Sequence, residues 1–161
     1  MKKTLVTFLT DQPALAATGA GLLTLLAAFI SEYGFGYHPC EMCWWQRYPY
    51  MVAGSLFLAF ASTGKTQHKS LLLLLMLIFM VNTSLAFFHV GVEEKWWEGI
   101  TTCAGSAGQI TLESIQNAPL IRCDEIQFSL LGISMAGYNF LIALSLTVFC
   151  GHSFLRRHRH D

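Results

Sequence analysis

Four long runs of apolar residues, separated by short polar segments, dominate the hydrophobic pattern of this chain. They cover residues 12–31, 44–64, 70–89 and 126–151, and Arg47 is the only Asp, Glu, Lys or Arg inside them. A helix rises about 1.5 Å per residue, so roughly 20 apolar residues suffice to cross the hydrocarbon core of a bilayer. As helices, these runs would satisfy their own backbone hydrogen bonds in lipid. The pattern therefore predicts an all-α integral membrane protein, a bundle of four spanning helices.

The composition agrees with a membrane class and limits the number of domains. Of the 161 residues, 53% are apolar and 12% are charged, a balance too apolar for an ordinary soluble domain. We interpret residues 1–161 as one membrane domain, and no basic patch indicates nucleic-acid binding. The first apolar run exceeds a typical signal-peptide core and lacks a small-x-small cleavage site near residues 29–31, so a retained anchor is expected.

Basic residues determine the expected orientation, because short loops rich in lysine and arginine stay in the cytoplasm. The loops at residues 32–43 and 90–125 carry mainly acidic side chains and are expected outside. Both termini are expected in the cytoplasm, and the longer outer loop has room for a short interfacial helix near residues 111–116. The basic residues on the cytoplasmic side are Lys2, Lys3, Lys65, Lys69, Arg156, Arg157 and Arg159.

The first candidate site is a C-x-x-C motif, Cys40 and Cys43, beside the predicted start of the second span. A helix N-terminus and nearby cations favour the thiolate form of such cysteines, and Arg47 lies one helical turn after Cys43. The pattern indicates a redox pair at the membrane boundary, within reach of a lipid-soluble electron acceptor. Half of a zinc site is the alternative. Cys150, at the inner end of the last run, is interpreted as a spectator.

A second cysteine pair, Cys103 and Cys123, lies in the longer outer loop with nineteen residues between its members. No second C-x-x-C or paired-histidine motif accompanies it, which makes a four-ligand zinc site awkward to complete. A structural disulfide is one interpretation. The other is exchange with thiols of a soluble partner, which the small residues at 104–108 favour. Two pairs at different distances from the membrane suggest that electrons pass inward by successive thiol exchange.

The chain resembles the DsbB family over nearly its whole length. The resemblance rests on residues 39–47 (PCEMCWWQR), 88–93 (FHVGVE), 122–125 (RCDE) and 132–139 (GISMAGYN), together with Cys103. In bacteria, DsbB passes electrons from the soluble oxidase DsbA to quinone and so keeps the periplasm oxidising. The outer loop is shorter than in the best-known members and mostly different, which leaves the partner open. Vitamin K epoxide reductases use similar chemistry, but their loop cysteines precede the C-x-x-C motif.

The resemblance also implies roles for individual residues. Cys40 and Cys43 would be the pair that quinone reoxidises, with Cys43 nearest the ring and Arg47 stabilising the charged thiolate. Cys103 would form a mixed disulfide with a periplasmic DsbA-like thiol oxidase, and Cys123 would exchange with Cys40. The implied protein is a multi-pass enzyme of the bacterial inner membrane whose active cysteines face the periplasm.

The implied cofactor is a quinone, either ubiquinone or menaquinone. His89, at the outer end of the third span, would hydrogen-bond a quinone carbonyl, and a histidine facing lipid headgroups is the alternative. Glu93, Glu94 and Glu98 are expected to form a solvated loop face without a catalytic role. The tryptophans at positions 44, 45, 96 and 97 are expected to form an aromatic belt at the outer interface.

Two hypotheses from other functional classes remain. A non-enzymatic metal-binding membrane protein would use Cys40, Cys43, Cys103 and His89 as ligands. A structural scaffold with two inert disulfides would explain neither the C-x-x-C motif at the bilayer edge nor the adjacent Arg47.

Overall fold

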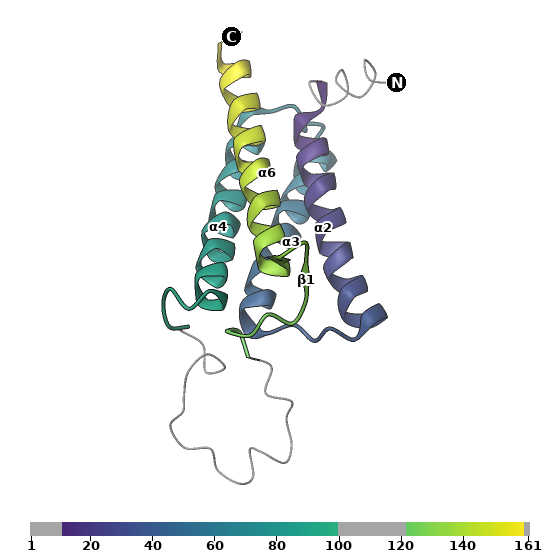
Figure 1. Ribbon diagram of the computed structural model, residues 1–161. Coiled ribbons are helices and arrows are strands. Elements are labelled where there is room, and N and C mark those ends of the chain that lie inside the picture. Colours follow the sequence, from purple (N-terminus) through teal and green to yellow (C-terminus); the bar gives the residue numbers. More distant parts are fainter. Residues whose placement is uncertain (1–10, 100–121, 160–161) are drawn as a thin grey trace.

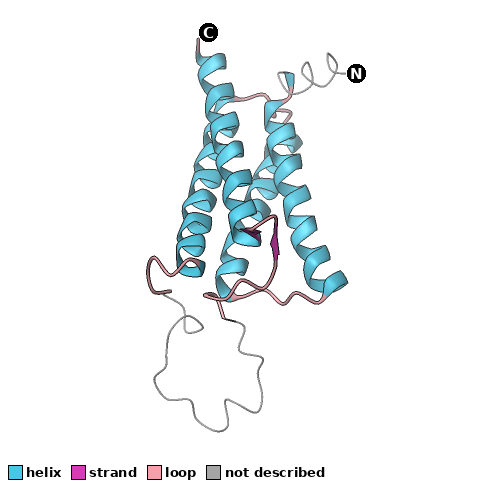
Figure 2. Cartoon of the chain, viewed as in Figure 1, coloured by secondary structure: helices cyan, strands magenta, loops and turns pink. Residues whose placement is uncertain are grey.

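The computed structural model describes residues 11–99 and 122–159. Figure 1 shows the helices of these segments side by side as a bundle, and Figure 2 shows a short hairpin near one end of it. The expected helical bundle is confirmed for the described residues, whereas the expected helix near residues 111–116 lies outside them. The elements are α2 (Pro13–Phe35), α3 (Glu41–Ser62), α4 (Lys69–Glu93), β1 (Ser129–Leu130), β2 (Ile133–Ser134) and α6 (Met135–His158).

Local sequence signals set several helix ends. Pro13 occupies the first turn of α2, where its missing N–H would have no helical partner in any case. Cys40 and Ser134 cap α3 and α6. Each side chain accepts a hydrogen bond from the backbone N–H three residues later, at 3.3 and 3.0 Å. The first cysteine of the C-x-x-C motif therefore also defines the start of α3.

The last helix begins later than its hydrophobic run predicts. Residues 126–134 are mostly apolar, yet they lead into and form the hairpin, in which Leu131 and Gly132 have φ angles of 53° and 80°. Helix α6 begins at Met135 instead of near residue 126 and continues to His158 instead of ending at residue 151. The prediction of this boundary was wrong because hydrophobicity does not separate an apolar turn from a helix.

Among the described residues, three helices, α2, α4 and α6, are long and apolar enough to cross a membrane. Helix α3 is similar in length, but the polar and aromatic residues of its first turns lower its mean hydropathy, and its crossing stays a prediction. The bundle also presents large apolar side chains outward, with Leu23, Leu58 and Val148 at 68%, 68% and 63% exposure. Such a surface suits lipid rather than water.

The bundle has an apolar middle and two chemically different ends. Leu71, Leu75 and Phe79 are fully buried in its main core. At one end, Gln67 and Arg157 donate hydrogen bonds to the Asp11 carbonyl oxygen at 2.9 and 3.3 Å, which ties together the two ends of the described chain and the α3–α4 turn. The C-x-x-C motif lies at the opposite end (Figure 1).

Candidate active site

The C-x-x-C motif forms the first turn of α3, and its two sulfur atoms lie 2.9 Å apart. Both residues are free thiols. Cys40 is buried and Cys43 is partly buried. The hydrogen bond that Cys40 makes to Cys43, together with burial, raises the pKa of the Cys40 thiol above its ordinary value. Within the pair, these contacts favour Cys43 over Cys40 as the thiolate.

Cys123 reaches this pair from a distant part of the sequence. Its side chain is 1% exposed and belongs to a small buried cluster with Cys40, Met42 and Val92. The proximity of Cys123 to Cys40 is what exchange between the two cysteine pairs requires. Cys103, the fourth expected catalytic cysteine, lies outside the described residues.

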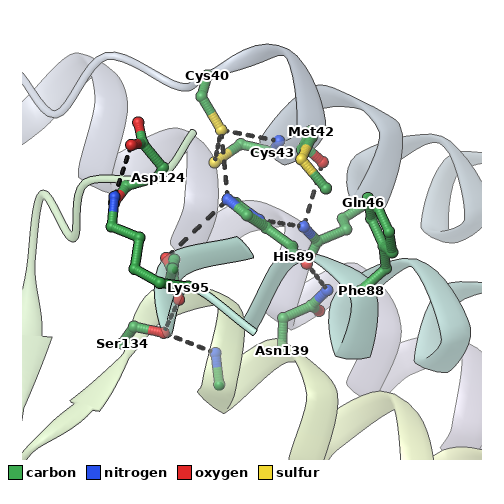
Figure 3. Close-up of polar contacts among 12 residues, drawn as sticks. Cys40, Met42, Cys43, Gln46, Phe88, His89, Lys95, Asp124, Ser134 and Asn139 are labelled. Atoms are coloured by element: carbon green, nitrogen blue, oxygen red, sulfur yellow. Dashed lines mark hydrogen bonds and ion pairs between the residues drawn. The ribbon is translucent and has the colours of Figure 1, made fainter. Parts of the chain in front are cut away.

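The residue after Cys123 fixes this segment to the end of α4. The Asp124 carboxylate accepts hydrogen bonds from Lys95 Nζ at 2.6 Å and from Arg122 Nε and Nη2 at 2.9 and 2.8 Å. These cations hold the pKa of the Asp124 carboxyl well below its usual range, because they stabilise its charged form. We call these three residues the Asp124 clamp (Figure 3 shows its Lys95 contact).

Arg47 is buried in the bundle, with 6% of its surface exposed. It forms an ion pair with Glu32 of α2, and its guanidinium carbon lies 4.7 Å from the Trp44 ring centre and 4.9 Å from that of Phe29. Two aromatic faces and one carboxylate therefore fix its position. Arg47 was expected from the sequence and Glu32 was not; the only signal for Glu32 is its place as the first acid after the first apolar run.

His89, the other expected cofactor-binding residue, is 3% exposed and lies between α3 and α4. Its Nε2 is 3.6 Å from Cys40 Sγ, and its Nδ1 is 2.7 Å from Gln46 Nε2 (Figure 3). This burial does not fit the alternative of a histidine that faces headgroups. A role for Gln46 was not expected from the sequence.

Glu93 corrects the expectation of a solvated acidic face. Its side chain is 8% exposed, with Oε1 4.0 Å from His89 Nε2, and it accepts a hydrogen bond from Ser134 Oγ. Helix α4 continues to Glu93, so residues four apart at positions 89 and 93 share one helical face. That spacing was the available signal. Glu94 and Glu98 are exposed, as expected.

These side chains line a cavity of about 350 Å³, with walls that include Leu25, Tyr50 and Ile142. Its polar lining residues include a group beside the C-x-x-C motif: Cys40, Cys43, Gln46, Arg47, His89 and Glu93. Mainly apolar walls with a few convergent polar groups are typical of small-molecule sites. The cavity suits a mainly apolar small molecule that also has polar groups.

Comparison with known proteins places these features in a family. The family model described as "Disulfide bond formation protein DsbB" matches residues 10–152. The chain is also 28% identical over 137 residues to "Uncharacterized protein RP370" of Rickettsia prowazekii (strain Madrid E), covering 81% of this chain and 79% of that protein. No solved structure matches the chain. The family match extends over both described segments of the site, and the chain belongs to the DsbB family of disulfide bond formation proteins.

Proposed function

We propose that the protein is a quinone-dependent protein disulfide oxidoreductase of the bacterial inner membrane. It reoxidises a periplasmic DsbA-like thiol oxidase and passes the electrons through two cysteine pairs to a membrane quinone. Membership of the DsbB family supports an oxidoreductase role in disulfide bond formation. One observation carries the finer proposal: Cys123 is buried against Cys40 beside an apolar cavity that Cys43, Arg47 and His89 line.

The proposed relay uses ordinary thiol–disulfide exchange. A partner thiolate attacks the Cys103–Cys123 disulfide at Cys103, and completion of that exchange leaves the partner oxidised and both loop thiols reduced. The Cys123 thiolate then attacks Cys40 in the Cys40–Cys43 disulfide, which releases Cys43 as a thiolate. Attack of Cys103 on Cys123 restores the loop disulfide and releases Cys40. Two electrons move inward per cycle, and each step exchanges one S–S bond for another.

The cavity fits the cofactor that the relay needs. A bound quinone, ubiquinone or menaquinone, would supply an acceptor for two electrons and two protons. The apolar walls would hold its ring, and Cys43 lines the same cavity. Arg47 lines the same cavity as Cys43, and its guanidinium, paired with Glu32, would stabilise a Cys43 thiolate. Buried His89 adds a polar group to the cavity wall.

The arrangement of charges supports the proposed orientation. The end of the bundle opposite the C-x-x-C motif contains the basic residues of the α3–α4 turn and of the end of α6, Lys65, Lys69, Arg156, Arg157 and Arg159. Under the positive-inside rule, this end would face the cytoplasm and the thiols would face the periplasm. Helix α3 would then be the fourth span, with its Arg47 neutralised inside the bundle by Glu32.

The proposal is tested by quinone reduction in detergent with a reduced DsbA-like donor, followed by ultraviolet absorbance. We expect turnover by the wild-type protein, none by Cys43→Ser, and wild-type turnover by the matched control Cys150→Ser, since Cys150 lies in the distant core. Turnover that survives in Cys43→Ser would refute the relay. A variant that keeps Cys103 but has Cys123→Ser should trap the donor as a mixed disulfide, and repeated absence of that species would refute the order of exchange.

A metal site is the second candidate, because one ligand atom from each of Cys40, Cys43 and His89 lies within 4.8 Å of the others. Two cysteines and a histidine are typical zinc ligands. This candidate predicts stoichiometric zinc in the purified, fully reduced protein and no quinone reduction with any donor. Turnover with less than stoichiometric metal would exclude it.

A further inference from the structure

We infer that Gln46 and Asn139 are positioning residues that hold His89 in its Nε2–H tautomer, with this N–H directed at the sulfur of Cys40. The tautomer follows from hydrogen-bond geometry alone. Its consequence for catalysis rests on the proposed function. The residues come from three helices, α3, α4 and α6, and Figure 3 shows them together.

The orientation of the Gln46 amide decides the tautomer. Its Nε2 lies 3.1 Å from the carbonyl oxygen of Met42, and a carbonyl oxygen can only accept a hydrogen bond. The amide NH2 group must therefore be on this side, and the same nitrogen lies 2.7 Å from His89 Nδ1. Because Gln46 donates to Nδ1, that ring nitrogen carries no proton.

Asn139 holds the amide from its other side. Its Nδ2 donates to Gln46 Oε1 at 2.7 Å, and its Oδ1 accepts from the hydroxyl of Tyr50 at 2.6 Å. Gln46 and Tyr50 are both buried, so water does not compete freely for these contacts. Turning the Gln46 amide over would place oxygen against the Met42 carbonyl and nitrogen against Asn139 Nδ2, which makes the observed orientation the favoured one.

The surroundings of His89 Nε2 independently agree with a proton on that atom. Its neighbours are Cys40 Sγ at 3.6 Å and Glu93 Oε1 at 4.0 Å, and the ring also contacts the backbone of Cys123. A sulfur atom, a carboxylate and a backbone carbonyl are all able to accept a hydrogen bond. A neutral His89 thus accepts from Gln46 on one side and faces acceptors on the other.

The chemical consequence concerns Cys40 as a leaving group. When an incoming thiolate attacks Cys123 in a Cys40–Cys123 disulfide, that S–S bond breaks and its electron pair remains on Cys40. The new thiolate can accept hydrogen bonds from the Cys43 backbone N–H, 3.3 Å away, and from His89 Nε2–H. Two N–H groups fixed before the reaction would stabilise the charge as it forms. Thiol exchange is faster when the leaving thiol is more stable as a thiolate.

The same tautomer disfavours metal binding at this cluster. A metal at Cys40, Cys43 and His89 would need the lone pair of His89 Nε2, and so a proton on Nδ1. Gln46 presents a donor to Nδ1, which opposes that arrangement. The network is therefore suited to stabilising a thiolate.

The direct test is nitrogen NMR of protein labelled with ¹⁵N-histidine, with His89→Asn used to assign the His89 signals. Wild-type protein should show a bare Nδ1 and a protonated Nε2. Gln46→Glu replaces the donor with an acceptor and should place a proton on Nδ1, while Gln67→Glu, the same change at the opposite end, should leave His89 unaltered. A protonated Nδ1 in wild type, or an unchanged pattern in Gln46→Glu, would overturn the inference. If Gln46→Glu does not fold, Asn139→Asp is expected to turn the Gln46 amide over and protonate Nδ1.

The catalytic part is tested by the rate at which Cys40 is released from a trapped Cys40–Cys123 disulfide. A hydrogen bond to a charged group corresponds to about tenfold to a hundredfold in rate, and we expect that loss in a variant whose Nε2 has lost its proton. A rate within twofold of wild type in that variant would overturn the catalytic part. If quinone is not reduced at all but the tautomer pattern holds, the proposed function fails and the tautomer assignment stands.

Discussion

Replacing Gly91 with alanine would place a methyl group where the Trp97 ring lies. A Cβ built on Gly91 would be 2.1 Å from Cζ2, 2.3 Å from Cε2 and 2.8 Å from Cη2 of that ring, whereas carbon atoms in contact prefer about 3.5–4.0 Å. The ring would have to move. It would then lose the hydrogen bond from its Nε1 to the Phe88 carbonyl oxygen, at 2.9 Å, and its stacking on the Phe88 ring.

The expected loss of stability follows from these contacts. Overpacking costs about 1–3 kcal/mol. Loss of one hydrogen bond costs ~1 kcal/mol, and loss of one aromatic pair costs ~1 kcal/mol. These losses result from the same displacement of the Trp97 ring, so they are included in the overpacking range and not added to it. Alanine also gains about 1 kcal/mol over glycine inside a helix. Gly19→Ala provides the matched control, because a Cβ there meets nothing within 4 Å. This variant gains the helix propensity of alanine without any overpacking. Gly91→Ala should therefore be less stable than Gly19→Ala by about 1–3 kcal/mol.

The measurement is equilibrium unfolding of both variants in mixed micelles, with tryptophan fluorescence as an independent report on Trp97. Gly91→Ala should have a lower free energy of unfolding than Gly19→Ala and a changed emission spectrum in the folded state, while Gly19→Ala should keep the wild-type spectrum. Equal stabilities with an unchanged spectrum would show that Trp97 does not pack on Gly91, and would refute the reasoning.

Three further predictions concern residues around the site. Glu32→Gln keeps an acceptor for Arg47 but removes its charge, and should lower the free energy of unfolding by about 1–3 kcal/mol in the same assay; an unchanged value would contradict a buried ion pair. Asp124→Asn should slow exchange from the loop pair to Cys40 about fivefold, as for loss of ~1 kcal/mol. Because the pKa of Asp124 is held low, the wild-type clamp should persist as pH falls through the ordinary Asp range and loosen only below it. The ratio of the wild-type exchange rate to that of Asp124→Asn, measured by stopped flow, should stay constant through that range, and a ratio that falls to one within it would contradict this. Cys150→Ala should leave quinone turnover unchanged while lowering stability by about 1 kcal/mol, and lost turnover in a folded variant would contradict a spectator role.

Sequence reasoning located the helices because lipid and core impose one strong requirement, a long apolar run. Helices α2 and α4 therefore coincide with runs 12–31 and 70–89, apart from a few added residues, mainly at their C-terminal ends. The start of α6 was missed because residues 126–134 are as apolar as a span. The deciding feature there is backbone conformation at Leu131 and Gly132, which an average over side-chain hydrophobicity does not contain.

The site could be predicted only as far as residue chemistry and short spacings reach. The C-x-x-C motif with Arg47 four residues later is a local pattern, and its residues lie together in the first turns of α3. Gln46 and Glu93 were missed because their roles depend on partners from other helices, His89 and Ser134. A glutamine in an apolar run or an acid at a helix end can have many different partners. Which partner it contacts depends on how the helices pack.

The distribution of polar contacts explains why this end of the bundle is also structurally important. Apolar packing offers little net attraction between helices in lipid, so interhelical hydrogen bonds contribute more to which helices associate. Near the thiols, each of the four described helices supplies at least one polar side chain that contacts another. Changes in this network should therefore alter helix association and thiol geometry together, and a loss of turnover identifies a chemical role only where the free energy of unfolding is unchanged. The contacts are Glu32 to Arg47, Gln46 to His89, Gln46 to Asn139, Tyr50 to Asn139, and Glu93 to Ser134.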